Sequence, residues 1–200
     1  MSKAAARSSK VSRTTSETSI ILKLTIDGQG TAKIATSVPF LDHMLTLFAV
    51  HGFFDLTIEA KGDTEIDDHH TVEDIGICLG QAFKEALGDK SSIRRYGNST
   101  VPMDEALVRV SLDLSNRPFL HYGVRIKDQK VGSFDTSLAE EFLRAFSLHA
   151  GLTLHVEMAH GENAHHIIEA TFKALGKALD QATLPEPRLK KTALSSKGML

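Results

Sequence analysis

Polar and hydrophobic residues alternate along several short segments of the chain, whereas in other segments the hydrophobic residues recur every three or four positions. Alternation is typical of strands with one buried face, and the longer spacing is typical of helices with one buried side. In the first part of the chain this pattern predicts strands at 20–26, 31–36 and 54–60 and helices at 40–49 and 69–87. The glycine-containing segment between the first two strands predicts a hairpin that pairs them.

The second part of the chain repeats this order. Its pattern predicts strands at 106–114, 119–126 and 152–157 and helices at 138–149 and 165–182. Two copies of a strand–strand–helix–strand–helix unit indicate an internal duplication. The sequence therefore predicts an α+β fold with βαβ-type halves, in which each half has an antiparallel or mixed sheet with helices on one face.

The same pattern divides the chain into four parts. Residues 1–16 are rich in Ser, Lys, Arg and Ala and contain no acidic residue, which we interpret as a flexible tail rather than a targeting peptide. Residues 17–95 form the first half and residues 96–185 the second half, and the segment 89–104 is the linker between the repeated units. Two prolines end the last helix, and residues 186–200 form a C-terminal tail.

Composition excludes several classes of protein. The formal net charge is −2 and 42% of the residues are hydrophobic, so the chain lacks the basic field that attracts nucleic acid or an anionic membrane. No apolar run approaches the length of a membrane span. The single cysteine, Cys78, excludes an intramolecular disulfide and fits a reducing compartment. We therefore expect a cytoplasmic protein without a nucleic-acid or membrane partner.

Histidine is the residue type that points to chemistry, with 10 copies in 200 residues. A His-His-x-x-Glu motif begins the last predicted helix of each half. Residues four apart lie on the same side of a helix, so the first His and the Glu can bind one cation together. The second His points about 100° away and must serve another ion. The duplicated motif, which predicts two metal sites, consists of His69, His70, Glu73, His165, His166 and Glu169.

Each of these two ions still lacks a fourth ligand. His43 lies eight residues before His51, and Glu141 lies eight residues before His149, so His43 and Glu141 occupy matched positions in the two halves. These two residues are the natural candidates, although symmetry alone assigns the single histidines. The predicted sets are His43, His70, His165 and Glu169 for one ion, and His69, Glu73, Glu141 and His166 for the other.

The ligand types narrow the choice of metal. Imidazole and carboxylate without thiolate favour Mn, Fe, Ni, Co or Zn over metals that prefer soft ligands. Four protein ligands on a six-coordinate ion would leave two open positions, which suits catalysis.

Other polar clusters indicate an anionic substrate: Arg94-Arg95 in the linker, Arg117 in a turn, and the Ser195-Ser196-Lys197 run in the tail. Hydroxyls, backbone N–H groups and cations suit a phosphate group, although each cluster alone is a weak signal.

Several segments together resemble the imidazoleglycerol-phosphate dehydratase family, over nearly the whole chain. These segments are Phe40-Leu41-Asp42-His43-Met44-Leu45, Asp67-Asp68-His69-His70-Thr71-Val72-Glu73-Asp74, Ser115-Asn116-Arg117-Pro118-Phe119, Leu154-His155 and Asn163-Ala164-His165-His166. The resemblance implies a fold like domain 2 of ribosomal protein S5, two Mn²⁺ ions per active site, and a small-molecule phosphate substrate. It also implies an octahedral homo-oligomer of 24 subunits with active sites between subunits.

The resemblance also assigns roles to residues. It places the metal ligands on the two predicted sets, with Glu141 where some members of the family have His. It gives the duplicated motif residues and Glu17 catalytic roles, and it makes residues 186–200 a substrate-binding tail. The implied substrate contacts are Glu17, His43, His51, Arg95, Arg117, Ser195, Ser196 and Lys197.

The implied activity is that of a hydro-lyase of histidine biosynthesis, EC 4.2.1.19. Our hypothesis is a Mn-dependent dehydration of D-erythro-imidazole glycerol phosphate to imidazole acetol phosphate, through a metal-bound imidazolate and a diazafulvene-like intermediate. Glu17 or a metal-bound water is the candidate base. Two alternatives remain open, a dinuclear hydrolase of a phosphate ester and a non-catalytic metal-binding assembly protein. The arginines and the Ser-Ser-Lys tail argue against a metal store, which does not need them.

Overall fold

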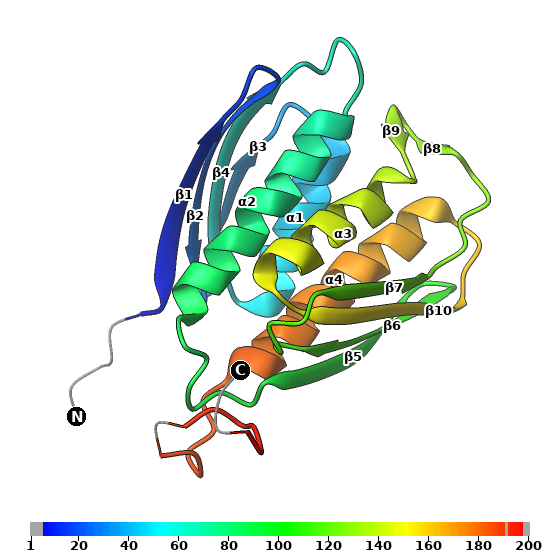
Figure 1. Ribbon diagram of the computed structural model, residues 1–200. Coiled ribbons are helices and arrows are strands. Elements are labelled where there is room, and N and C mark those ends of the chain that lie inside the picture. The colour runs from blue at the N-terminus through cyan, green and yellow to red at the C-terminus, as the bar shows by residue number, and fades with distance from the viewer. Residues whose placement is uncertain (1–5, 191, 198–200) are drawn as a thin grey trace.

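Two four-stranded sheets enclose a central layer of helices in the computed structural model, which describes residues 6–190 and 192–197 (Figure 1). The first sheet has the strand order β1-β2-β4-β3, and its neighbours are antiparallel except for the parallel pair β3 and β4. The elements of the first half are β1 (Ser8–Thr14), β2 (Thr18–Thr25), β3 (Ala32–Ala35), α1 (Pro39–Gly52), β4 (Asp55–Gly62) and α2 (His69–Leu87).

The second half repeats this topology. Its sheet has the order β5-β6-β10-β7, again with one parallel pair, β7 and β10. A short hairpin, β8 with β9, is inserted before the first helix of this half. The duplicated α+β fold that the sequence predicts is thus confirmed. The elements are β5 (Tyr96–Met103), β6 (Ala106–Asp113), β7 (Phe119–Gly123), β8 (Lys130–Val131), β9 (Phe134–Asp135), α3 (Leu138–Ala150), β10 (Thr153–His160) and α4 (Ala164–Thr183).

Two strands lie in segments that the sequence pattern left irregular. The flexible tail predicted for residues 1–16 is wrong for β1, which pairs with β2 along its whole length; residues 1–5 lie outside the described residues. The predicted linker 89–104 likewise contains β5. Both are edge strands with few buried apolar side chains, since β1 buries Val11 and β5 buries Val101. Their backbone hydrogen bonds therefore define them more than their hydrophobic pattern does.

The predicted hairpin between the first two strands is also wrong. β3 pairs with β4, whereas the neighbours of β2 are β1 and β4. The Asp55 side chain explains the path of the chain, because its Oδ1 accepts hydrogen bonds from the backbone N–H groups of Gln29 and Thr31, each at 2.9 Å. These bonds hold the turn against the start of β4 and direct the chain to the far side of that strand.

The helices pack in two parallel pairs, α2 with α3 and α1 with α4, between the two sheets (Figure 1). Two glycines at matched positions of the duplication allow this close approach. A Cβ on Gly80 would lie 2.9 Å from the backbone nitrogen of Ala150, and one on Gly176 would lie 3.1 Å from that of Gly52. The buried rings of Phe48, Phe54, Phe83 and Phe146 fill the space between the helices and the first sheet. Among the described residues, no helix could cross a lipid bilayer.

Candidate active site

The first turns of α2 and α4 carry the two His-His-x-x-Glu motifs. A polar side chain just before each motif stabilises the start of its helix. Asp67 Oδ1 accepts a hydrogen bond from the backbone N–H of His69 at 2.7 Å, and Asn163 Oδ1 accepts one from the backbone N–H of His165 at 2.9 Å. Each acceptor lies two residues before the first His of its motif and satisfies one free N–H at a helix start. The matched turns place both motifs at helix ends that face solvent.

One compact ligand cluster forms within the chain. Glu169 Oε2 lies 3.2 Å from His165 Nε2 and 3.5 Å from His43 Nε2, and one ligand atom from each of the three residues lies within 4.8 Å of the others. His43 comes from α1, and the other two residues come from α4, so the parallel packing of these helices builds the cluster. Two imidazoles and one carboxylate at this spacing fit a divalent transition metal.

The charge around Glu169 supports the same interpretation. Its side chain is only 9% exposed, and Lys173 Nζ lies 2.5 Å from its Oε1. Burial raises the pKa of the Glu169 carboxyl, but the hydrogen bond and charge of Lys173, with smaller contributions from His43 and His165, lower it overall. The carboxylate is therefore ionised and suited to bind a cation. Lys173 is a site residue that sequence reasoning missed, although its place four residues after Glu169 on the same helical face was a usable signal.

The second predicted ligand set does not come together within one chain. His69 Nε2 lies 4.0 Å from Glu73 Oε2, as their spacing on the helix predicts. Glu141 instead lies beside Arg144, whose Nε is 3.7 Å from its Oε2, and His166 contacts Asp104 and Glu105. Among the described residues, the cluster around Glu169 is the one group of three with metal-ligand spacing. The full second set, and the place of His70 in the first, stay predictions.

The second histidine of each motif is held through its Nδ1 atom. His70 Nδ1 lies 3.0 Å from Asp63 Oδ2, and His166 Nδ1 lies 2.7 Å from Glu105 Oε2. These hydrogen bonds are the main cause of a raised pKa of both imidazoles, and the bond to His166 is the main cause that lowers the pKa of Glu105 to about 2. In both rings Nε2 makes no hydrogen bond among the described residues, and the nearest carboxylate to His166 Nε2 is that of Asp104, with its Oδ2 at 3.7 Å. Glu17, the predicted catalytic acid–base residue, has its Oε1 3.8 Å from His70 Nε2.

The predicted anion-binding residues gather in a different place. An open cavity of about 590 Å³ is lined by Arg95, Tyr96, Ser115, Asn116, Arg117, Ser195, Ser196 and Lys197. Five of these eight residues are substrate contacts that the resemblance implies, and they come from three separate parts of the sequence. Two guanidinium groups, an ammonium group and several hydroxyls around one cavity suit a phosphate ester.

Buried polar contacts shape this cavity. The Arg95 guanidinium donates two hydrogen bonds to Asp113, at 2.6 and 2.9 Å, and a third to the backbone oxygen of Leu194 in the tail, at 2.6 Å. The pair with Asp113 raises the pKa of Arg95, so its charge is permanent. Arg117, in contrast, has a side chain that is 70% exposed. Lys90, Arg95 and Asn116 all have left-handed backbone conformations, which non-glycine residues seldom adopt outside constrained sites.

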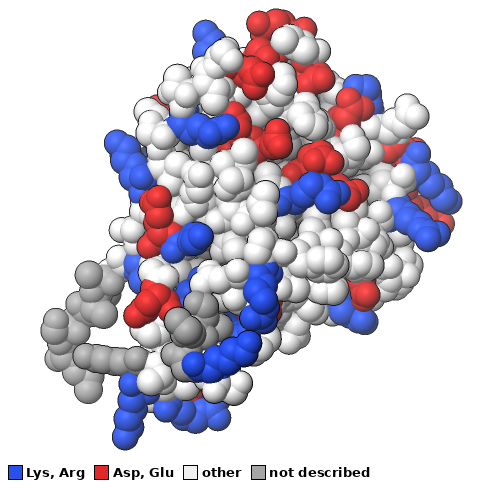
Figure 2. Space-filling model, in the orientation of Figure 1, with Lys and Arg blue, Asp and Glu red and all other residues white. Residues whose placement is uncertain are grey.

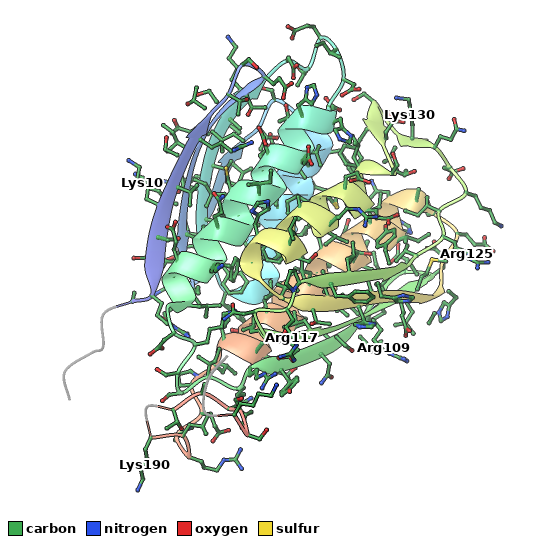
Figure 3. The ribbon with its side chains drawn as sticks, in the orientation of Figure 1. Lys10, Arg109, Arg117, Arg125, Lys130 and Lys190 are labelled. Carbon is green, nitrogen blue, oxygen red and sulfur yellow. The ribbon has the colours of Figure 1, made fainter. Side chains whose placement is uncertain are left out.

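The ligand cluster and the basic cavity lie at opposite ends of α4. His165 is in its first turn, whereas the backbone oxygen of Ala182 in its last turn accepts a hydrogen bond from the backbone N–H of Arg95. At 1.5 Å per residue, 17 residues of helix separate the two ends by about 25 Å. In Figure 2 acidic residues gather above the start of α2, whereas basic residues lie around the C-terminal tail and in the lower part of the molecule, where Figure 3 labels Arg117 and Lys190.

His51, another implied substrate contact, lies at neither end. It is in the last turn of α1 and faces α4. Burial lowers the pKa of its imidazole, and the positive charges of Lys173 and Lys177 lower it further. His51 is therefore a neutral imidazole at neutral pH. Its role in substrate binding stays a prediction.

The fold and the site together define a class: an internally duplicated α+β protein with a histidine and glutamate candidate metal centre and a separate basic cavity. A model of the imidazoleglycerol-phosphate dehydratase family matches residues 36–179. The chain belongs to the imidazoleglycerol-phosphate dehydratase family, and it is a hydro-lyase of histidine biosynthesis.

Individual relatives match this chain over nearly all of its length. The chain is 60% identical over 195 residues to imidazoleglycerol-phosphate dehydratase of Geobacillus kaustophilus, covering 98% of this chain and 100% of the relative. The solved structure of the Staphylococcus aureus enzyme superposes with a TM-score of 0.81 at 44% identity, covering 89% of this chain and 99% of that one. The Pyrococcus furiosus enzyme, solved in complex with (S)-C348, gives 0.82 at 43% identity, covering 95% and 100%.

Proposed function

We propose that this chain catalyses a Mn²⁺-dependent dehydration of D-erythro-imidazole glycerol phosphate to imidazole acetol phosphate, in active sites shared between subunits of a homo-oligomer. The observation that carries the proposal is the convergence of His43, His165 and Glu169 in one ligand cluster. Imidazole and carboxylate ligands suit Mn²⁺ as well as Zn²⁺ and Fe²⁺. Two bound ions would hold the imidazole nitrogens of the substrate and stabilise negative charge on its ring.

The residues of the chain have two tasks in this reaction. Arg117, Lys197 and the adjacent serines bind the phosphate, which fixes the reacting carbon relative to the ring. Arg95 holds the tail in place through the backbone oxygen of Leu194. Glu17, with its Oε1 at 3.8 Å from His70 Nε2, accepts the proton from the carbon that becomes the ketone. The hydroxyl leaves the neighbouring carbon as water, and the resulting enol tautomerises to the ketone.

The separation along α4 supports a shared active site. The substrate is much shorter than the distance of about 25 Å between the ligand cluster and the basic cavity. One chain therefore cannot bring its own cavity to the phosphate while its own ligand cluster holds the imidazole. A second copy that supplies the other end solves this, and repeated use of one such contact gives a closed symmetric assembly. The proposed assembly is the octahedral particle of 24 subunits.

Metal analysis and particle size, each measured with and without chelator beside a dehydration assay, test this proposal. We expect bound Mn²⁺, a large particle, and loss of turnover on chelation that added Mn²⁺ restores. Full turnover in metal-free protein would overturn the proposal. Release of inorganic phosphate would favour the phosphate-ester hydrolase, and metal-dependent assembly without turnover would favour the non-catalytic assembly protein.

Glu17 is tested separately by Glu17→Gln, with Glu65→Gln as the control, since Glu65 is an exposed glutamate on the loop before α2. We expect Glu17→Gln to keep its metal content and to lose turnover by about 100-fold or more, which is the usual contribution of a positioned acid–base group. Turnover near that of the unmodified protein, with metal content intact, would rule out Glu17 as the essential base.

A further inference from the structure

The duplication gives Glu17 a counterpart that no motif indicates. Glu17 lies in the turn between β1 and β2, immediately before β2 begins. Glu105 lies in the turn between β5 and β6, immediately before β6 begins. Because β1 matches β5 and β2 matches β6 in the two sheets, the two glutamates occupy equivalent positions. Each one lies beside the second histidine of the motif in its own half.

The two equivalent glutamates nevertheless make different contacts. Glu105 Oε2 lies 2.7 Å from His166 Nδ1, and its Oε1 accepts hydrogen bonds from the backbone N–H groups of Asn163 at 2.8 Å and Glu162 at 3.2 Å. Both oxygens of Glu105 are therefore occupied at the start of α4. Glu17, in contrast, lies 3.8 Å from the Nε2 atom of His70.

The first half fills the Nδ1 position from another part of the chain. Asp63 follows β4, and its two carboxylate oxygens lie 3.0 and 3.2 Å from His70 Nδ1. The Asp63 side chain is 16% exposed, less than the 48% of Glu17. Because Asp63 already satisfies Nδ1, Glu17 is not needed to hold the ring, and its carboxylate lies on the Nε2 side.

We propose that Glu105 and Asp63 are positioning residues, which hold His166 and His70 with Nε2 turned outward to bind metal, and that the hydrogen bond from Asp63 leaves Glu17 for the reaction. This inference rests on the proposed metal-dependent function. A carboxylate that accepts the Nδ1–H of an imidazole fixes the proton on Nδ1, so that Nε2 keeps the lone pair that binds a metal ion. The same turn position thus has a structural role in one half and a catalytic role in the other.

Replacement of each carboxylate by its amide tests the tautomer directly. In Glu105→Gln the amide oxygen still accepts the backbone N–H groups of Asn163 and Glu162, while the amide NH₂ group faces His166. An NH₂ group donates to Nδ1 rather than accepting from it, which moves the imidazole proton to Nε2 and blocks the metal ligand atom. Asp63→Asn replaces the charged acceptor at His70 Nδ1 by a neutral amide, which weakens this hydrogen bond whichever amide atom faces the ring. The matched controls are Glu162→Gln and Glu65→Gln, which neutralise exposed glutamates near the same helix starts.

Mn²⁺ titration of the assembled protein, with free Mn²⁺ followed by its electron paramagnetic resonance signal, gives the affinity. We expect Mn²⁺ binding to weaken about 10- to 100-fold in Glu105→Gln and Asp63→Asn, as on loss of other outer-shell partners of metal ligands. The controls should match the unmodified protein. At saturating Mn²⁺ both positioning variants should recover most of kcat, whereas Glu17→Gln should bind Mn²⁺ normally and lose kcat.

The outcomes separate this inference from the proposed function. Unmodified protein that neither binds Mn²⁺ nor depends on it overturns the proposed function itself. Unmodified protein that binds Mn²⁺ and turns over, together with normal Mn²⁺ affinity in Glu105→Gln and Asp63→Asn, overturns the inference alone. If thermal melting shows that Glu105→Gln is unfolded, Glu105→Asp replaces it: this variant keeps the acceptor but withdraws it by one methylene group, and unchanged affinity there also contradicts the inference.

Discussion

The two ends of α4 differ in almost every physical property. At its start, His165 and Glu169 meet His43 around one candidate cation site, with the ionised carboxylate buried beside Lys173. At its end, Arg95 joins the C-terminal tail to β6 through Asp113 and Leu194, and it lines a cavity with other cationic and hydroxyl groups. One end collects ligands for a cation, and the other collects ligands for an anion.

The distance between the two ends of α4 is as informative as the chemistry of each end. A rigid helix of 20 residues keeps the two ends apart at a fixed distance, and no side-chain rearrangement shortens that distance. Under the proposed function both half-sites act on one small molecule, and because they cannot meet in one chain the complete site would need a second copy. Each prediction below acts on one end of this comparison or on both.

The largest effect is expected from Glu169→Gln at the ligand end. This change removes the one carboxylate of the cluster and leaves Lys173 without its ion-pair partner. Loss of an outer-shell partner costs roughly 10- to 100-fold, so loss of a direct anionic ligand should lower kcat/KM by about 1000-fold or more. Steady-state kinetics and metal analysis check this, with Glu157→Gln on the exposed outer face of β10 as the control. Retained metal and near-normal turnover would show that the cluster is not the metal site.

A mixture of two impaired variants tests whether the two ends belong to different chains. Arg117→Glu damages the anion end, and Glu169→Gln damages the ligand end. When both variants are dissociated and reassembled together in equal amounts, about a quarter of the shared sites combine two undamaged ends, as random pairing in a symmetric oligomer requires. With substrate well below KM, activity should therefore rise more than 100-fold above that of the Glu169→Gln protein alone and well above the mean of the two separate variants.

The complementation experiment has a clear negative outcome. If each chain carried a complete active site, no mixture could exceed the mean of the two separate variants. A double variant that carries both changes in one chain, mixed with unmodified chains, is the control. This control mixture should give no more activity than the fraction of its sites that are built from two unmodified chains.

Arg117→Glu alone should have a smaller effect, and a different one. Arg117 is largely exposed and lies 3.8 Å from Asp113 Oδ2, so its replacement leaves the fold intact while it repels the phosphate. We expect KM to rise about 100-fold, equivalent to about 2.7 kcal/mol of binding free energy, with a smaller fall in kcat. Arg109→Glu, which alters an exposed arginine on the outer face of β6 (Figure 3), is the control. An unchanged KM for Arg117→Glu would remove it from the anion site.

The ligand end was the more predictable of the two from sequence. The His-His-x-x-Glu spacing on a predicted helix requires that His165 and Glu169 share a side, and the eight-residue offset identified His43 as the matched residue. Helix pairing then brings His43 to Glu169 within one chain. The second ligand set could not be completed in the same way. Glu141 pairs with Arg144 on its own helix, and in the part of the chain that the structure describes no third ligand joins His69 and Glu73.

The residues of the anion end could not be predicted from hydrophobic periodicity. Arg95 lies in the predicted linker, which has no hydrophobic repeat. The sequence pattern places its partner Asp113 in a strand and does not indicate that this carboxylate orients Arg95. The edge strands β1 and β5 were missed for a related reason, because backbone pairing with one neighbour needs almost no apolar signal. Contacts between distant segments, such as Lys90 with Asn116 across 26 residues, follow from packing that only the folded chain defines.

The smallest effect on turnover is expected for Lys90, a buried cation beneath the anion end, which acts on stability instead. Its side chain is 1% exposed, and its Nζ donates a hydrogen bond to Asn116 Oδ1 at 2.7 Å in the wall of the cavity. Burial lowers the pKa of Lys90 to about 8, with a further contribution from Lys84. The unfolded chain has a lysine pKa of about 10.4. Between these values the unfolded state binds the proton more strongly than the native state does.

Stability should therefore respond to pH in one window. Below pH 8 both states are protonated, and the cost of burying the charge is constant. From about pH 8 to about 10.4 the native state loses the proton first, so the free energy of unfolding rises by up to about 3 kcal/mol. Urea unfolding of the unmodified protein across this range measures the rise. Lys90→Met should lack it, whereas Lys10→Met, which removes an exposed lysine of β1 (Figure 3), should keep it. Equal pH slopes in all three proteins would show that Lys90 titrates like a surface lysine and that the anion end has no buried cation beneath it.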